Sequence, residues 1–390
     1  MPTKEDSRAP ASAKLRVVDP SDGAQTPSDR EIEEVAKNLD LSIKVIGCGG
    51  AGSNTVDRCV KSGLREVFLC AVNTDSKHLL KVKAHKKLLI GRSLTKGLGA
   101  GARPEIGEKA ALESEDDIRA CVSQANIVFV TAGMGGGTGT SAAQVASRLA
   151  KSSGSLTVGV VTLPFKSEGE LRMTNAMAGL GKLARVCDTT IVIPNDVLLE
   201  LVPRLPVEAA FTVADELLVQ TISGLTEMLK ESGLVNVDFA DLKTILIEGG
   251  LSLIGVGESS LRTEERLEDA VAEALDSPLL GKMDLKGAKG ALVRIVGGPD
   301  MSIEEAARAA EMVTERINPD GRLIWGCSVR REMEGLVRVL IIVTGAQSKY
   351  VLLREGEDPV MYPTNVDYRG RLNIPSSQTG EDEDSSMFIR

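Results

Sequence analysis

This 390-residue sequence has few histidines and no closely spaced pair of cysteines. It has two histidines, His78 and His85, and six scattered cysteines without a C-x-x-C pair. A zinc site would need more ligands nearby, and histidine general-base catalysis has few candidates. We expect the cysteines to be small buried thiols in a reducing compartment. Any chemistry must therefore rest on carboxylates, amides and backbone groups.

Long apolar runs and an excess of positive charge are also lacking. No run approaches the roughly eighteen residues of a membrane span, and the N-terminal MPTKEDSRAPASAK has no apolar signal core. The net charge of −9 argues against a broad nucleic-acid footprint. We therefore expect a cytoplasmic protein with no direct membrane insertion and no nucleic-acid partner.

The first half of the chain alternates strand-like and helical patterns. Residues 1–38 read as a disordered extension that ends in a short helix. Between 39 and 207, near-continuous apolar runs such as IKVIG, VFLCAVN, ANIVFVTAG and LTVGVVTLP alternate with helical segments. This order predicts an α/β fold, with a Rossmann-like parallel sheet covered by helices on both faces.

The second half changes order. An uninterrupted helical pattern predicts a long central helix over 208–233. The predicted strands beyond it are ILIEGGLSLIGVGES, GALVRIVGG, RLIWGCSV and VRVLIIVTG, and Ser302 and Glu305 have capping-box spacing at a helix start. Residues 234–350 are therefore predicted to form a second, smaller α/β domain. We expect 351–390 to be a flexible acidic tail.

The stretch GCGGAGSN follows the first predicted strand and opens a predicted helix. Backbone N–H groups and a helix N-terminus there can face an anion. Gly47, Gly49 and Gly52 have the spacing of a dinucleotide-binding turn, and Asp75 lies 23 residues beyond, near where such a site carries an acid. A tight strand-to-helix turn that binds nothing gives the same pattern, so both interpretations stay open on this motif alone.

Two further glycine loops favour a longer phosphate chain. TAGMGGGTGTS follows a predicted strand and offers bare amides with the hydroxyls of Thr138 and Thr140, while KGLGAGARPEIG adds Gly99 and Gly101. Loops at the ends of parallel strands converge on one crevice, so three of them predict a triphosphate gripped along its length. No G-x-x-x-x-G-K-[ST] occurs, which excludes a P-loop NTPase.

Further motifs follow in order along residues 40–350. They are AVNTD, TLPFKSEGELRM, IPNDVLL, NVDFAD and LIWGCSV. With the three glycine loops they resemble the FtsZ family of prokaryotic tubulin relatives, and LPVEAAFTVADELL and the short tail are more similar to archaeal members. The resemblance implies a GTP-hydrolysing cytoskeletal protein that polymerises and acts in division at mid-cell.

The resemblance also implies which residues bind GTP. The first loop and GGGTGT hold the phosphates, the third loop senses the γ-phosphate, and Glu168 and Arg172, after Pro164, lie near the ribose and phosphates. Asp75 and Asn195 belong to the same site. The loop residues are Gly49, Gly50, Ala51, Gly52, Ser53, Asn54, Gly99, Ala100, Gly101, Ala102, Gly135, Gly136, Gly137, Thr138, Gly139 and Thr140. Taken alone, Glu168 reads as a solvated surface carboxylate.

One departure from the family pattern lies just after GGGTGT. Ser141 and Gln144 stand where many relatives have glycine and proline. Serine can still start a helix, so we expect phosphate binding to survive.

Guanine selection is assigned to Phe211 and Asp215, one helical turn apart on one face. A carboxylate can accept from both N1–H and the 2-amino group of guanine, whereas adenine offers no such paired donors. An unpaired carboxylate opposite adenine would cost roughly 1–3 kcal/mol. Phe211 supplies a stacking face. Glu216 is the alternative acid, and by itself Phe211 would be ordinary core; we favour Asp215.

NVDFAD puts Asn236, Asp238 and Asp241 just beyond the central helix. The resemblance implies that these groups orient and polarise the attacking water, although a capped turn between helices gives the same pattern. About twenty helical residues, or roughly 30 Å, separate them from the base site. They should therefore complete the nucleotide site of the next subunit, and such a heterologous head-to-tail contact generates filaments.

The expected cofactor is Mg²⁺, held mainly by phosphates and water because it dehydrates reluctantly. The tail carries four acids, Glu381–Asp384, and then SSMFIR. The resemblance implies that Met387, Phe388 and Ile389 dock a membrane-tethering adaptor, while composition alone gives a solubilising tail. Two rival functions stay open: a GTP-binding, weakly hydrolysing scaffold paralogue, and a Rossmann dehydrogenase.

Overall fold

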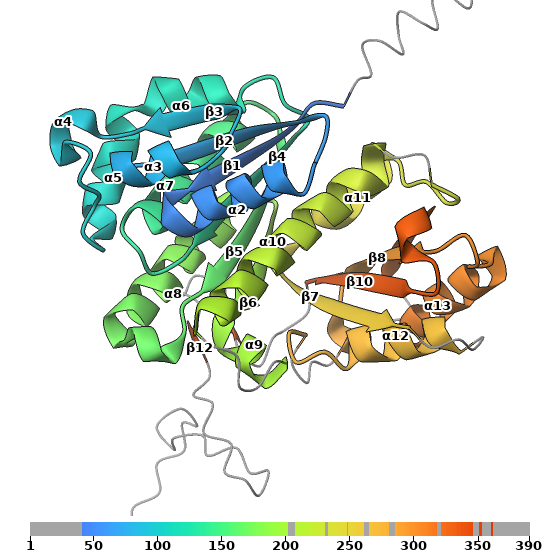
Figure 1. Cartoon of the computed structure of the whole chain (residues 1–390). Helices are drawn as coiled ribbons and strands as arrows, with labels where there is room; N and C mark the ends of the chain where they lie inside the picture. The colour runs from blue at the N-terminus through green and yellow to red at the C-terminus, as the bar shows by residue number, and fades with distance from the viewer. Residues whose placement is uncertain are drawn as a thin grey trace, which may run out of the picture. The chain divides into compact units, whose positions relative to one another are not determined.

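Six parallel strands form the first half of the sheet, in the order β3-β2-β1-β4-β5-β6 (Figure 1). They are β1 (Ile43–Cys48), β2 (Val67–Asn73), β3 (Lys86–Leu89), β4 (Ile127–Gly133), β5 (Leu156–Leu163) and β6 (Thr189–Pro194). The central strands are buried along almost their whole length, which explains their near-continuous apolar sequences. The predicted parallel α/β sheet is confirmed.

The computed structural model describes residues 41–201, 207–230, 233–247, 249–260, 265–280, 285–317 and 321–345, and the short segments 351–352 and 360–361. The predicted helix near the N-terminus and the acidic end of the tail lie outside these residues. Val351–Leu352 (β11) pairs antiparallel with Val360–Met361 (β12), within the part expected to be a flexible tail.

Helices connect the strands and cover the sheet. They are α2 (Gly49–Lys61), α3 (Ser76–Lys81), α4 (Arg92–Thr95), α5 (Pro104–Glu113), α6 (Glu115–Val122), α7 (Thr138–Ser152), α8 (Glu170–Val186), α9 (Asn195–Leu201) and the long α10 (Val207–Lys230). α2 packs against α10, whereas α5, α6 and α8 pack around α7. These two groups cover opposite faces of the sheet (Figure 1).

The second half adds four strands to the same sheet. β7 (Gly250–Ser259), β8 (Gly290–Gly297), β9 (Arg322–Val329) and β10 (Val337–Thr344) follow in the order β7-β10-β8-β9, with β10 antiparallel to both neighbours. β7 pairs parallel with β6 from Thr189↔Gly250 to Ile191↔Ser252, so one ten-stranded sheet runs through both halves. Sequence patterning did not predict this join.

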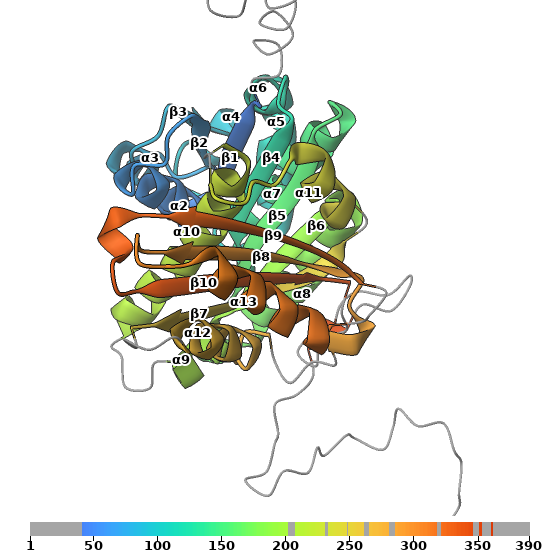
Figure 2. The same cartoon turned by 90° about the vertical axis from the view of Figure 1, so that its right-hand side faces the viewer.

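The helices of the second half are α11 (Phe239–Leu246), α12 (Arg266–Leu275) and α13 (Ile303–Arg316). Figure 2 views this half, with β7 to β10 crossing in front of α10. The capping box at α13 is confirmed, since the Ser302 hydroxyl accepts from the Glu305 N–H and the Glu305 carboxylate accepts from the Ser302 N–H.

One predicted strand was wrong at its start. ILIEGGLSLIGVGES was expected to be extended throughout, but Ile245 and Leu246 end α11 and the strand begins at Gly250. Leu242, Ile245 and Leu246 are buried with the i, i+3, i+4 spacing of a helix face. The short apolar run ILI did not distinguish that helix end from a strand.

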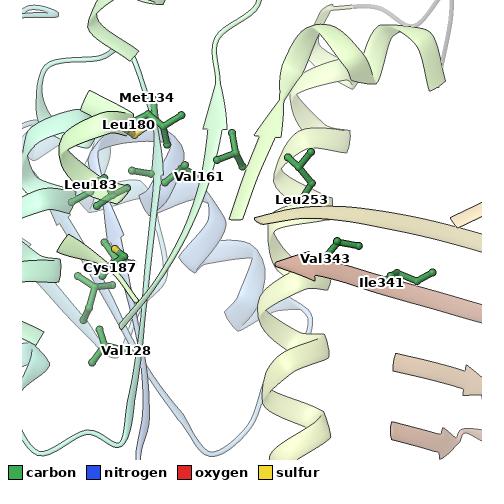
Figure 3. Close-up of a cluster of buried hydrophobic side chains, with 14 of the residues drawn as sticks. Val128, Met134, Val161, Leu180, Leu183, Cys187, Leu253, Ile341 and Val343 are labelled. Atoms are coloured by element: carbon green, nitrogen blue, oxygen red, sulfur yellow. The ribbon is translucent and has the colours of Figure 1, made fainter. Parts of the chain in front are cut away.

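One hydrophobic core joins the two halves. In Figure 3, Val128 and Val161 of the parallel strands and Leu180 of α8 lie on one side, and Leu253 and Ile341 of β7 and β10 lie on the other. All six cysteines are free and buried, as predicted. The continuous core and shared sheet fix α10 between the halves.

Candidate nucleotide-binding site

A cavity of about 430 Å³ opens where the predicted loops meet, at the carboxyl ends of β1, β2, β4, β5 and β6. Open α/β sheets bind ligands at this edge. The predicted site residues that line it are Gly50, Ala51, Asp75, Ala100, Ala102, Gly136, Gly137, Thr138, Gly139, Pro164, Glu168, Arg172, Asn195, Phe211 and Asp215. The structure therefore brings residues from the three glycine loops together with Phe211 and Asp215, the pair predicted to select guanine, at one cavity.

Two helix N-termini, those of α2 and α7, face this cavity through Gly50 and Thr138. Neither helix has a side-chain cap, so its first N–H groups are not satisfied by a neighbouring side chain. A Cβ added at Gly50 or Gly136 would meet nothing within 4 Å. Bare amides and two positive dipole ends on open space suit a polyphosphate.

Other glycines of these loops are needed because neighbouring segments of the chain pass too close for a side chain. A Cβ at Gly52 would lie 2.3 Å from the Thr131 carbonyl oxygen of β4, and one at Gly137 would lie 2.8 Å from the Ala100 Cβ. Gly49 has φ +73°, and a Cβ there would lie 2.6 Å from the Gly139 backbone nitrogen. The dinucleotide-like spacing of the first loop thus reflects tight strand-to-helix packing as well as open amides.

Hydroxyl and amide groups fix the start of α7. Thr138 Oγ1 lies 2.7 Å from Thr74 Oγ1, and Thr140 Oγ1 accepts from the Gly135 N–H at 2.9 Å. Ser141 Oγ donates to the Gly137 carbonyl at 2.6 Å, and Gln144 Nε2 donates to the Thr140 carbonyl at 2.8 Å. Both departures from the family pattern therefore bond to the backbone of this helix turn without filling the cavity.

Phe211 and Asp215 of α10 also line the cavity. Phe211 is 41% exposed, and its ring stands edge-on to that of Phe165, with 5.0 Å between the ring centroids. Asp215 Oδ2 accepts from Arg58 Nε at 3.2 Å. Burial raises the pKa of Asp215 to about 6, although Arg58 acts to lower it. A partly buried carboxylate beside an open ring can pair with the donor edge of a purine.

Asn195, at the end of β6, has a buried Oδ1 with no hydrogen-bond partner among the described residues. A buried acceptor left unpaired is costly, so the site fits a ligand that brings a donor to it. Glu168 pairs with Arg172 one turn along and also accepts from the Phe165 N–H at 2.9 Å. Glu168 therefore fixes its own loop and is not a free surface carboxylate.

Some predicted residues lie outside the cavity lining. Those of the glycine loops are Gly49, Gly52, Ser53, Asn54, Gly99, Gly101, Gly135 and Thr140. Asn236, Asp238 and Asp241 are also outside it, at the start of α11. Asp238 Oδ1 accepts from the Asp241 N–H at 2.8 Å, so Asp238 is the N-cap of α11.

Sequence reasoning missed several lining residues. They are Asn73, His78, Gly133, Met134, Thr162 and Ala214. Asn73 and Gly133 end strands whose loops were already singled out, so strand-end position was a usable signal. His78 and Arg58 had no such signal, because their partners are set by tertiary contacts.

Two larger hollows lie elsewhere. One of about 580 Å³ lies between α10 and β7, β8 and β10, and one of about 920 Å³ lies beside α12 and α13. Charged side chains line both, and neither lining includes the glycine loops. In the parts of the chain that the structure describes, no group of three or more His, Cys, Asp or Glu side chains could hold a metal ion. No described helix is long and apolar enough to cross a membrane.

Two family profiles match this chain. The GTPase domain of the tubulin/FtsZ family matches residues 42–203, and the C-terminal domain of the FtsZ family matches 250–347. "Cell division protein FtsZ" of Haloferax mediterranei is 49% identical over 332 residues, covering 85% of this chain and 87% of that protein. "Cell division protein FtsZ 1" of Pyrococcus horikoshii is 50% identical over 331 residues, covering 85% and 88%.

Solved structures agree. An empty FtsZ dimer of M. jannaschii has 45% identity and a TM-score of 0.79, covering 86% of this chain and 97% of that one. Fold and site together define a GTPase of the tubulin type, with a parallel nucleotide-binding sheet joined to a second α/β half. Within that class, the chain belongs to the FtsZ family.

Proposed function

We propose that this chain hydrolyses GTP within head-to-tail filaments and acts at the cell-division site. GTP binds in the cavity at the carboxyl edge of the parallel strands. Asp215 accepts from N1–H and the 2-amino group of guanine, and Phe211 packs against the base. Asn195 Oδ1 accepts a hydrogen bond from another donor of the nucleotide. The amides of Gly50, Gly136 and the loop glycines around them bind the phosphates.

The observation that carries the proposal is the separation of two half-sites along α10. Phe211 and Asp215 lie in its second and third turns, whereas Asn236, Asp238 and Asp241 follow its last turn. Twenty-four residues make a helix about 36 Å long at 1.5 Å per residue. Figure 1 shows α9 beside one end of α10 and α11 beside the other.

Groups at opposite ends of one helix cannot act on one γ-phosphate in the same subunit. They can meet when one copy stacks on another, because the cavity end of the first then faces the α11 end of the second. Asp238 and Asp241 would orient and polarise the attacking water there. This contact is heterologous and does not close, so it generates a filament. Two copies in the M. jannaschii FtsZ dimer support self-association as a property of the family.

Mg²⁺ would be held mainly by the phosphates and water. It supplies charge neutralisation of the β- and γ-phosphate oxygens when bound. Asp75 lines the cavity, and although its Oδ1 accepts from the His78 N–H at 3.0 Å as the N-cap of α3, its second oxygen could accept from the water ligands of Mg²⁺.

The tail is proposed to bind a membrane-tethering adaptor through Met387, Phe388 and Ile389, which lie outside the described residues. Such an adaptor would hold filaments at the division site. A second candidate function is a scaffold paralogue that binds GTP, assembles and hydrolyses little. Asp241 disfavours it, because helix capping accounts for the Asp238 carboxylate but not for that of Asp241.

The test measures phosphate release and sedimentation together, over a range of protein concentrations, in GTP and in GDP. We expect both signals to begin at the same critical concentration in GTP, with no pelleting in GDP. Assembly with negligible phosphate release would favour the scaffold. Full turnover by dilute, unassembled protein would contradict the shared site.

A further inference from the structure

We infer that His78 is a positioning residue that fixes the amide orientation of Asn54 and thereby selects guanine over 6-aminopurines. The inference rests on the proposed function, because it concerns GTP in the same cavity. His78 lines that cavity, and Asn54 lies beside it on α2.

A chain of hydrogen bonds begins at Asn73, the last residue of β2. Its Oδ1 accepts from the Thr74 N–H at 2.8 Å and from the Asp75 N–H at 3.3 Å. Two backbone donors therefore determine which end of this amide is oxygen. The Asn73 Nδ2 group is left pointing at His78 Nδ1, 3.3 Å away, and must be the donor.

The imidazole tautomer follows from this. Nδ1 of His78 accepts, so the ring proton lies on Nε2. Nε2–H then donates to Asn54 Oδ1 at 3.0 Å. Because the oxygen of Asn54 is engaged, its Nδ2 hydrogens are the part of the amide available to a ligand. Asn54 Nδ2 has no hydrogen bond within the described part of the chain.

Asn54 is exposed and not itself part of the cavity lining, but helix geometry places it next to residues that are. Ala51 lines the cavity, Asn54 follows it by three residues, and Arg58 follows Asn54 by four, so all three share one face of α2. Arg58 bonds to Asp215, the proposed reader of guanine. Asn54 is thus one turn from the base end of the cavity and one turn from its phosphate end.

The chemistry distinguishes the purines. Guanine has an O6 acceptor, which pairs with an amide N–H of Asn54. Adenine and 2,6-diaminopurine have a 6-amino group, which is a donor and cannot pair with the donor N–H of Asn54. A freely rotating asparagine would turn its oxygen toward that amino group, but the His78 relay prevents this. His78 therefore acts on the 6-position, whereas Asp215 reads N1–H and the 2-amino group.

The experiment compares binding of GTP and of 2,6-diaminopurine riboside triphosphate, which keeps the 2-amino group. We expect His78→Ala to lower about tenfold the dissociation constant of the diaminopurine nucleotide divided by that of GTP. Without His78, the Asn54 amide can turn its oxygen toward the 6-amino group. His78→Gln keeps an N–H able to reach Asn54 Oδ1 and should restore most of the ratio. His85→Gln is the matched control, because His85 accepts from the Leu69 N–H at 3.0 Å and stacks on Phe68, outside the cavity.

A spectroscopic readout accompanies the binding data. The chain has only two histidines, so labelled imidazole nitrogens give two sets of signals, which His85→Gln assigns. We expect His78 to show an unprotonated Nδ1 and a protonated Nε2, and GDP to shift its signals while His85 stays unchanged. The opposite tautomer, or an unchanged ratio in a His78→Ala variant that still binds GTP, would overturn the inference. A wild-type chain that binds no GTP would overturn the proposed function as well.

Discussion

Arg58 of α2 and Asp215 of α10 form an ion pair, with 3.2 Å between Nε and Oδ2, and Asp215 lines the proposed GTP cavity. The two residues are 157 positions apart in the chain. The Asp215 side chain is only 15% exposed, so its charge is held in place but poorly solvated. In the proposed function, this one carboxylate both binds guanine and makes that binding depend on pH.

GTP binding should weaken as the pH falls through about 6, where the carboxyl of Asp215 becomes protonated in the free protein. A protonated carboxyl can no longer accept from both guanine donors. We expect affinity to drop up to tenfold per pH unit below that point. Calorimetric titrations between pH 5 and 8 measure the GTP dissociation constant. Asp215→Asn is the control, because it should lose the part of the pH dependence that comes from Asp215.

The same substitution should change stability in the opposite sense to binding. The pKa of Asp215 is raised from 3.8 to about 6. Its contribution to stability is therefore present below pH 4 and lost as the pH rises through 6. At pH 7, Asp215→Asn should stabilise the unliganded protein by roughly 2–3 kcal/mol while lowering GTP affinity tenfold or more. A lower Tm with unchanged affinity would contradict both statements.

Substitutions at Gly135 and Gly136, which are neighbours in one loop, should separate an effect on stability from an effect on GTP binding. A Cβ at Gly136 meets no atom within 4 Å, so Gly136→Ala should leave the Tm of the free protein nearly unchanged and weaken GTP binding. Gly135 has φ +94°, and a Cβ there would lie 2.6 Å from the Arg172 carbonyl oxygen. Gly135→Ala should therefore lower the Tm without any nucleotide present. Thermal melts with and without GDP test the pair, and equal melting shifts in the free proteins would refute the distinction.

Asp238 is the N-cap of α11, and substitution can separate this observed role from the proposed role in GTP hydrolysis. It caps α11 through the Asp241 N–H, so Asp238→Ala should cost about 1 kcal/mol of stability as well as GTP turnover. Asp238→Asn keeps a capping oxygen and should recover the stability but not the turnover. Urea unfolding and phosphate release on both variants test this. Full activity in Asp238→Asn would mean that the carboxylate charge is not used.

Glu227 of α10 joins the two halves of the chain through Arg294 and Arg330. The Glu227 and Arg294 side chains are 15% and 12% exposed, so Glu227→Gln should cost about 2 kcal/mol by removing the negative charge that Arg294 and Arg330 share. Glu258→Gln, which breaks the exposed pair with Arg338, should cost less than about 1 kcal/mol. Denaturant unfolding compares the two variants, and equal losses would rule out a special role for the α10 contact.

The fold could be predicted where apolar runs and glycine loops repeat in order. Runs such as Ile43–Cys48 and Leu156–Leu163 are buried along almost their whole length and read as strands without ambiguity. Ile245 and Leu246 were misread because a short apolar run fits a helix end as well as a strand. The pairing of β6 with β7 was not predictable, since three residue pairs leave no signal in composition.

The candidate site also contains residues that the sequence predicts and residues that it does not. Loop amides such as Gly50 and Gly136 were found because glycine spacing at strand ends has a physical meaning. The Arg58–Asp215 pair and the His78 relay were missed because their members are brought together only by the folded sheet. A separation of 24 residues between Asn54 and His78 follows no local periodicity.

The most direct test of the shared site mixes two variants that are inactive alone. Asp241→Ala keeps the cavity and loses the completing carboxylate, whereas Asp215→Ala keeps that carboxylate and loses base recognition. In a random one-to-one filament, about a quarter of the contacts join an intact cavity to an intact Asp241. We predict that GTP turnover recovers to about that fraction of the wild-type rate on mixing. No recovery in mixtures that co-assemble would contradict completion of the site by the neighbouring subunit.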